Sequence, residues 1–115
     1  MGFKVYDESQ LPEGFIYPPE FLRIVASLAF DTLYPWWFID APSEPGRLML
    51  SFVAERGLVP FAKTDLYDDI ACFDGSDGSG DPKIEIICST PEVTYSYPSF
   101  SEWLAMAKSD AELTE

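Results

Sequence analysis

The sequence predicts one compact domain that contains both helices and β-strands, and three observations support this prediction. The chain has 115 residues, enough for one domain that buries roughly two thirds of its unfolded surface. Hydrophobic residues make up 47% of the chain and aromatic residues 16%, so we expect a packed core despite a net charge of −13. Apolar residues recur at helical spacing near both ends, and runs of strand-forming residues separated by turn residues lie between them.

Residues 1–16 are expected to form an irregular arm that packs through its aromatic residues, because proline and glycine interrupt them repeatedly. A first helix is expected from Pro19 to about Leu33, since proline suits the first turn of a helix. Four apolar residues then recur at i, i+3, i+4 and i+7: Phe21, Ile24, Val25 and Leu28.

The middle of the chain predicts a strand at Trp36–Ile39, a turn-rich linker at 43–46, and a further strand at Leu58–Ala62. Pro60 predicts that this later strand is an edge strand, or that it bends beside a loop. The segment 47–56, between the linker and the later strand, fits either a strand or a helix. Its residues alternate like a strand, while the following glycine favours a helix. The helical face would contain Leu48, Met49, Phe52 and Val53.

Two strands, 70–74 and 83–89, flank a run of turn-forming residues, which predicts a long-looped antiparallel hairpin. A last strand is expected at 93–97. Ser99 and Glu102 then fit a capping box at the start of the final helix. Its apolar stripe contains Phe100, Trp103, Leu104 and Ala107, and residues 109–115 are expected to form a polar, frayed tail.

Composition excludes several functions. The chain has no histidine, which rules out a Ser-His-Asp triad, a Cys-His pair and any histidine metal site. A charge of −13 and a pI near 4.1 argue against direct binding to a phosphate backbone. A macromolecular partner is therefore expected to be basic.

The N-terminal residues lack the pattern of a signal peptide, and no apolar run is long enough to cross a bilayer. Cys72 and Cys88 each lie in an apolar stretch. We therefore expect a cytoplasmic protein, without membrane contact, whose thiols are reduced and buried. A disulfide between the two cysteines is the alternative for an exported protein.

Six aspartates fall within 17 residues: Asp65, Asp68, Asp69, Asp74, Asp77 and Asp81. A calcium loop that starts at Asp74 lacks the acid at position five and the glycine at position six that an EF-hand requires. A magnesium site would need acids that converge from separate elements, with cations for a substrate phosphate. The two remaining interpretations are a negative surface that recruits a basic partner and a solubilising loop. We expect no metal and no cofactor.

The aromatic residues are expected mainly in the core, because they lie on periodic faces. Trp36 and Trp37 are adjacent in a strand and therefore face opposite sides, so one of them would be exposed beside the acids as an interface anchor. Serine, threonine and cysteine nucleophiles lack a convincing base, and no nucleophile elbow or phosphate-binding loop is present. The sequence thus predicts no catalytic residue.

The order of elements resembles the SUKH superfamily, the Smi/Knr-like proteins. Tyr17–Leu22 resembles its proline-then-helix opening, and Leu58–Ala62 resembles its "pro-phe-ala" strand. Asp68–Asp74 looks like the next strand, which is entered through acidic residues and left into a Gly/Asp turn. Pro82–Ser89 and the "Ser-Phe-x-x-Trp-Leu" helix at Ser99–Leu104 complete the series over nearly the whole chain.

This resemblance implies an α+β fold, with a mixed, mainly antiparallel sheet of about four to six strands packed with N-terminal, middle and C-terminal helices. It also implies a non-catalytic binding role. Many bacterial members look like immunity proteins that neutralise a toxin, often one that acts on nucleic acid, while eukaryotic relatives are intracellular regulators. We therefore expect an immunity protein, a monomer or weak dimer, that occludes the active cleft of a basic toxin. A regulatory or scaffold module without a toxin is the alternative. The expected partner-binding residues are Asp65, Asp68, Asp69, Asp74, Asp77 and Trp36.

Overall fold

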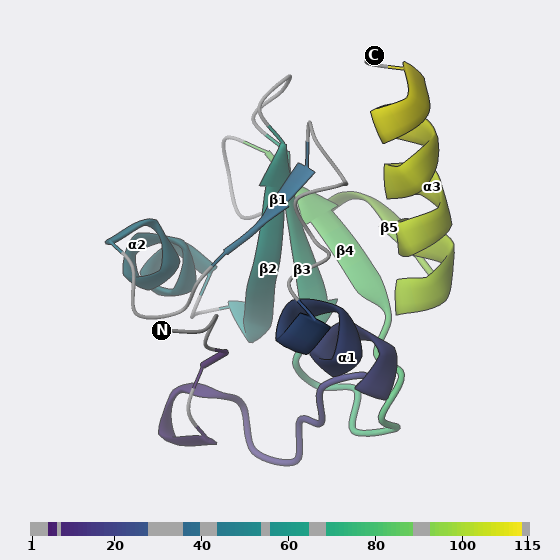
Figure 1. The fold of residues 1–115 in the computed structure, drawn as a ribbon. Helices are drawn as coiled ribbons and strands as arrows, with labels where there is room; N and C mark the ends of the chain where they lie inside the picture. Colours follow the sequence, from purple (N-terminus) through teal and green to yellow (C-terminus); the bar gives the residue numbers. More distant parts are fainter. Residues whose placement is uncertain are drawn as a thin grey trace.

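The computed structural model describes residues 5–6, 8–27, 36–39, 44–53, 56–64, 69–88 and 93–113, and it folds them into three α-helices and five β-strands (Figure 1). The elements follow one another as η1 (Glu8–Gln10), α1 (Pro19–Ser27), β1 (Trp36–Phe38), α2 (Glu44–Val53), β2 (Leu58–Thr64), β3 (Ile70–Asp74), β4 (Ile84–Ile87), β5 (Val93–Tyr97) and α3 (Phe100–Leu113). The predicted α+β class is confirmed.

The strands form one sheet in the order β1-β2-β3-β4-β5, and every neighbouring pair is antiparallel. Each strand thus pairs with the next one along the chain. The hairpin predicted between 70–74 and 83–89 is β3 and β4, in which Phe73 lies opposite Ile84. All of the sheet that the structure describes is antiparallel, which agrees with the expected mainly antiparallel arrangement.

Strand β2 lies inside the sheet, so the prediction that Pro60 marks an edge strand is wrong. The reason is local. Strand β1 pairs only with residues 62–64 of β2, and the register of β2 against β3 shifts between Pro60 and Ala62. The bulge places one extra residue, Phe61, in β2, where the backbone amide of Ile39, just after β1, donates to the Phe61 carbonyl oxygen at 2.8 Å. Proline therefore sits in an interior strand beside a bulge, where one side of the strand is not paired with β1.

The sheet separates two hydrophobic clusters. The first contains the buried faces of α1 and α3, and the second contains Val53 of α2 with Leu58, Cys72 and Ile87 of the sheet. Figure 1 shows α1 and α3 in front of the sheet and α2 beside β2. Leu50 of α2 also packs against the first cluster. Helix α2 therefore covers the sheet where β1 ends.

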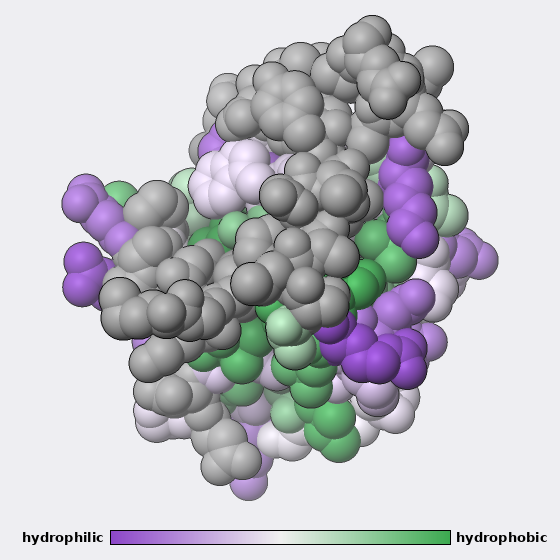
Figure 2. Space-filling view, viewed as in Figure 1, coloured by the Kyte–Doolittle hydropathy of each residue, from purple (hydrophilic) through white to green (hydrophobic). Residues whose placement is uncertain are grey.

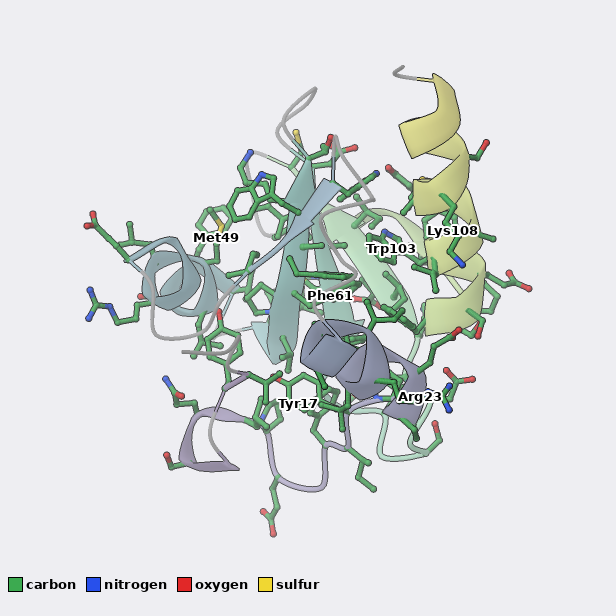
Figure 3. All side chains as sticks on the ribbon, viewed as in Figure 1. Tyr17, Arg23, Met49, Phe61, Trp103 and Lys108 are labelled. Atoms are coloured by element: carbon green, nitrogen blue, oxygen red, sulfur yellow. The ribbon has the colours of Figure 1, made fainter. Side chains whose placement is uncertain are left out.

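Aromatic rings fill the first cluster, as the sequence predicts. Phe61 is 1% exposed, and its ring centroid lies 4.1 Å from that of Phe73 and 4.9 Å from that of Trp103. Trp103 points from α3 toward Phe61 and the sheet, whereas Lys108 projects away from them (Figure 3). Phe21 of α1 makes an edge-on contact with Phe61 at 5.6 Å. The core thus depends on one bulged strand residue that both helices contact.

The N-terminal arm packs through aromatic side chains, which confirms that expectation. Tyr17 stacks on Phe21 with centroids 5.4 Å apart, and Phe15 contacts Phe73 at 5.8 Å. Tyr6 is 4% exposed, and its hydroxyl donates to the carbonyl oxygen of Gly46 in α2. One 3-10 turn, η1, interrupts the otherwise irregular arm. The arm therefore belongs to the folded domain.

Two predicted helix boundaries differ from the structure. Helix α2 begins at Glu44 rather than at residue 47, because Pro45 is tolerated in the first turn and the glutamate suits the positive end of the helix dipole. Helix α3 continues to Leu113, so the frayed tail predicted from residue 109 is wrong up to that residue. Helix α1 is described to Ser27, and its predicted continuation lies outside the described residues.

The final helix begins with the Ser99 half of the predicted capping box. The backbone amide of Glu102 donates to the Ser99 hydroxyl at 3.3 Å, and the amide of Trp103 donates to the Ser99 carbonyl oxygen at 3.2 Å. These bonds satisfy two amides of the first turn. All four residues of the predicted apolar stripe are buried.

Cys72 and Cys88 are both free thiols, so the disulfide alternative is not the arrangement found. Cys72 is buried and lies opposite Glu85, three residues before Cys88. Three residues of a strand span about 10 Å, which is too long for a disulfide. Burial raises the pKa of the Cys72 thiol, and the nearby Glu85 carboxylate adds to the effect. This thiol is therefore a core side chain, whereas Cys88 is half-buried.

Candidate functional site

The aspartates that are close in sequence do not form one group in space. Asp69 lies immediately before β3, and Asp74 is the last residue of that strand. Five residues of an extended strand span about 16 Å, so the two carboxylates lie at opposite ends of β3. Asp65 and Asp68 lie outside the described residues. The predicted acidic surface is therefore divided into a part at the start of β3 and a part in the β3–β4 loop.

The carboxylates of Asp74 and Asp77 accept hydrogen bonds from the backbone of the β3–β4 loop itself. The Asp74 carboxylate accepts hydrogen bonds from the backbone amide of Ser76 at 3.0 Å and from its hydroxyl at 2.6 Å. The Asp77 carboxylate accepts from the amides of Ser79 at 3.0 Å and Lys83 at 3.3 Å. The Ser79 hydroxyl and then the Ser79 amide hold the pKa of Asp77 below its usual value. These two carboxylates therefore stabilise a turn, whatever else they contact.

Asp69 has a different environment. Its Oδ2 accepts a hydrogen bond from the Tyr95 hydroxyl at 3.1 Å. Tyr95 lies on β5 and is 42% exposed, and its ring meets that of Tyr97 edge-on at 5.8 Å. Tyr95 lies opposite Ile86, and Ile86 lies opposite Ala71, two residues after Asp69. The sheet register thus brings a carboxylate and an exposed aromatic ring together from strands two places apart.

Trp36 does not fit its predicted role as an exposed anchor. Its side chain is 4% exposed, and its ring meets that of Trp103 edge-on at 5.4 Å. The two tryptophans do face opposite sides of β1, because Trp36 belongs to the first cluster and Trp37 packs against the second. Trp37 is the half-buried member of the pair. Strand alternation predicted the division correctly, but it did not show which face α3 covers.

Within the described residues, a carboxylate is rarely paired with a cation. In the part of the chain that the structure describes, one ion pair is present, between Lys83 Nζ and Glu85 Oε1 at 3.5 Å. Acids such as Glu13, Asp81 and Glu102 are exposed to solvent. Figure 2 shows hydrophilic side chains over α1 and α3, beside hydrophobic residues nearer the arm. Because the net charge is −13, the field around the protein is negative.

Two open depressions are formed by described residues. One, of about 430 Å³, is bordered by the starts of α1 and α3 and by Gly80 and Asp81, and Arg23 and Glu20 line it. Ser101 donates a hydrogen bond to Glu20 there, at 2.7 Å. The other, of about 390 Å³, is bordered by arm residues 11–16. The second depression is lined by no hydroxyl or thiol, and in the first the one lining hydroxyl, that of Ser101, makes its bond to Glu20 at an exposed position.

Metal binding and membrane insertion find no support in the described residues. Within them, no group of three or more histidine, cysteine, aspartate or glutamate side chains could hold a metal ion. The loop from Asp74 is flanked by strands β3 and β4, whereas an EF-hand loop joins helices. None of the helices described here combines the length and the apolar character that a bilayer-crossing segment needs.

No protein-family model, curated protein or solved structure matches this chain. The site must therefore be judged from its own chemistry. The two parts of the acidic surface differ in that chemistry, because one is engaged in a turn and the other combines a carboxylate with an exposed tyrosine. The Asp69–Tyr95 pair was not predicted, since its members are 26 residues apart and only the sheet register joins them.

Proposed function

We propose that this chain is a non-catalytic protein-binding domain that covers a basic protein partner. The observation that carries the proposal is a net charge of −13, the excess of 20 acidic over 7 basic residues, with a single ion pair among the described residues. Opposite charge on a partner speeds encounter and suppresses association with acidic proteins. An antiparallel sheet with helices on it is rigid enough to present such a surface without reorganising.

The partner is a toxin that acts on nucleic acid, and the chain is its cytoplasmic immunity protein. A nucleic-acid-binding cleft must be basic, so an acidic domain that fills it competes directly with the phosphate backbone. The resemblance of the chain to the SUKH superfamily supports this form of the proposal. A typical interface buries about 800 Å² on each partner, which a patch on one side of a domain this size provides.

Capture of partners from native cells tests the proposal. We expect the tagged chain to retain a basic protein whose reading frame neighbours its own, and whose activity on nucleic acid is lost in the complex. Affinity should fall steeply as salt rises from 50 to 500 mM, because charge attraction is screened. Capture of a basic protein without toxic activity would instead favour a regulatory module of the same fold.

Charge reversal locates the binding surface. The double variant Asp68→Lys/Asp69→Lys should weaken binding of the captured partner at least tenfold. The matched control, Glu13→Lys/Glu102→Lys, makes the same change in net charge at two exposed residues elsewhere. Equal losses in both doubles would show that only overall charge matters. Retention of no basic protein, or turnover of a substrate by the purified chain, would overturn the proposed function.

A further inference from the structure

Tyr95 is an exposed aromatic residue whose ring is held in place. Its side chain is 42% exposed, yet its hydroxyl donates a hydrogen bond to Asp69 Oδ2 at 3.1 Å. Its ring also meets that of Tyr97 edge-on, with centroids 5.8 Å apart. A ring fixed in this way loses little conformational entropy when a partner packs on it. Rigid exposed tyrosines are frequent anchors of protein interfaces.

The contact with Asp69 adds negative charge at the edge of the ring. One carboxylate oxygen accepts the tyrosine hydroxyl, and the carboxylate of this half-buried residue has further lone pairs that can accept hydrogen bonds. A cation over the ring would gain from the π system and from the carboxylate together. Asp68, which precedes this residue in the chain, is a further acid.

Arginine matches this pair better than lysine does. A planar guanidinium can stack on an aromatic face and at the same time donate in-plane hydrogen bonds to a carboxylate, whereas an ammonium group is a point charge with a stronger hydration shell. A nucleic-acid base could also stack on Tyr95, but its phosphate would meet a chain that carries −13. The chemistry therefore favours an arginine side chain on a protein.

We infer that Tyr95 and Asp69 form an arginine-binding site through which the basic partner docks beside edge strand β5. The inference rests on the proposed function and specifies which group of the partner is recognised. Tyr95 supplies the stacking surface, Tyr97 supports its ring, and Asp69 accepts the guanidinium hydrogen bonds. The acids of the β3–β4 loop contribute to the general field, since their carboxylates are engaged by the turn.

An NMR titration with acetylated, amidated tetra-arginine tests the site in the intact chain. The largest shifts are expected at residues 69 and 95, and tetra-lysine should bind there more weakly. Tyr95→Ala should lower the affinity for tetra-arginine, measured from the shifts near residue 69, about two- to fivefold, as expected for an exposed cation–π contact. The ratio of the affinity for tetra-arginine to that for tetra-lysine should also become smaller. Asp69→Asn should lower the affinity for both peptides.

Phe52→Ala is the matched control, because Phe52 is an aromatic residue of similar exposure, 41%, on α2. This substitution should change neither the affinity for tetra-arginine nor that for tetra-lysine. If Tyr95→Ala alters the spectrum far from β5, Tyr95→Leu keeps the bulk of the side chain without its π system.

Shifts centred on the loop of residues 74–83, or equal affinities in wild type and Tyr95→Ala, would overturn the arginine site while leaving the proposed function intact. Failure of the proposed function would instead be seen in the capture experiment, where no basic protein would be retained.

Discussion

Replacing Phe61 by alanine tests whether the aromatic cluster is the main source of stability. Phe61 is 1% exposed and lies at the bulge of β2, where rings from α1, α3 and β3 meet it. The closest ring, Phe73, is stacked on it with centroids 4.1 Å apart. Removing the ring would leave a cavity between strands and helices that are fixed by their own hydrogen bonds, so little collapse is expected.

The expected loss follows from the burial of the ring. Truncation of a buried phenylalanine to alanine costs about 3–5 kcal/mol, and we expect about 4 kcal/mol here. A domain of this size has a total free energy of unfolding of roughly 5–15 kcal/mol. The variant should therefore still fold, with much of its stability lost.

Equilibrium unfolding in urea, followed by tryptophan fluorescence, measures the change. With an m-value of about 2 kcal/mol/M, the midpoint should fall by about 2 M without a change in slope. Phe52→Ala is the control, because this ring is 41% exposed, and its loss should cost less than about 1 kcal/mol. A loss at Phe61 no larger than that of the control would refute the packing argument.

Three further predictions concern the β3–β4 loop and the thiols. The folded-state pKa of Asp77 lies below its usual 3.8, so its carboxylate stabilises the native state above that pH, and this contribution is lost as the pH falls through the folded-state pKa. Acid unfolding curves of wild type and Asp77→Asn should therefore differ above pH 4 and converge only at a pH below the folded-state pKa. A thiol reagent should modify Cys88 in the native protein and Cys72 only after unfolding, and rapid modification of both would contradict the burial of Cys72. Gly75→Ala should cost about 1–3 kcal/mol in urea unfolding, because a Cβ there would lie 2.0 Å from the Gly57 carbonyl oxygen; unchanged stability would show that this turn yields easily.

Local patterns predicted the helices of the first cluster well. The spacing of Phe21 and Val25, and of Phe100 and Trp103, identifies residues that are all buried in the structure. The Ser99 cap was also visible, because capping depends on a few neighbouring residues. Such features can be predicted from sequence because the physical cause and the residues that show it lie within one or two turns.

The middle helix shows where periodicity is insufficient. The predicted buried face of 47–56 included Leu48 and Phe52, yet these are 59% and 41% exposed in α2. Val53 is buried, and Met49 and Leu50 are half-buried, so the true face is rotated from the predicted one. The position of α2 beside β2 determines this rotation, and no pattern within the helix contains that information.

The candidate site could be predicted only in part. Sequence reasoning identified Asp69 as an acid that contacts a partner, and that function stays a prediction. It did not show that Asp74 and Asp77 bind their own loop, or that Tyr95 joins Asp69. These relations depend on loop geometry and on sheet register, which arise after strands far apart in the chain have paired.

Residues from both ends of the chain meet in one core, because Tyr6 and Trp103 belong to the same buried cluster. A ribosome that has released all five strands but not yet α3 thus carries a sheet whose aromatic face is covered only by the arm and α1. Chaperones and proteases act on exposed surface of this kind. Chains cut short before residue 103 should therefore be degraded rather than accumulate, because they lack the α3 residues that cover this part of the core.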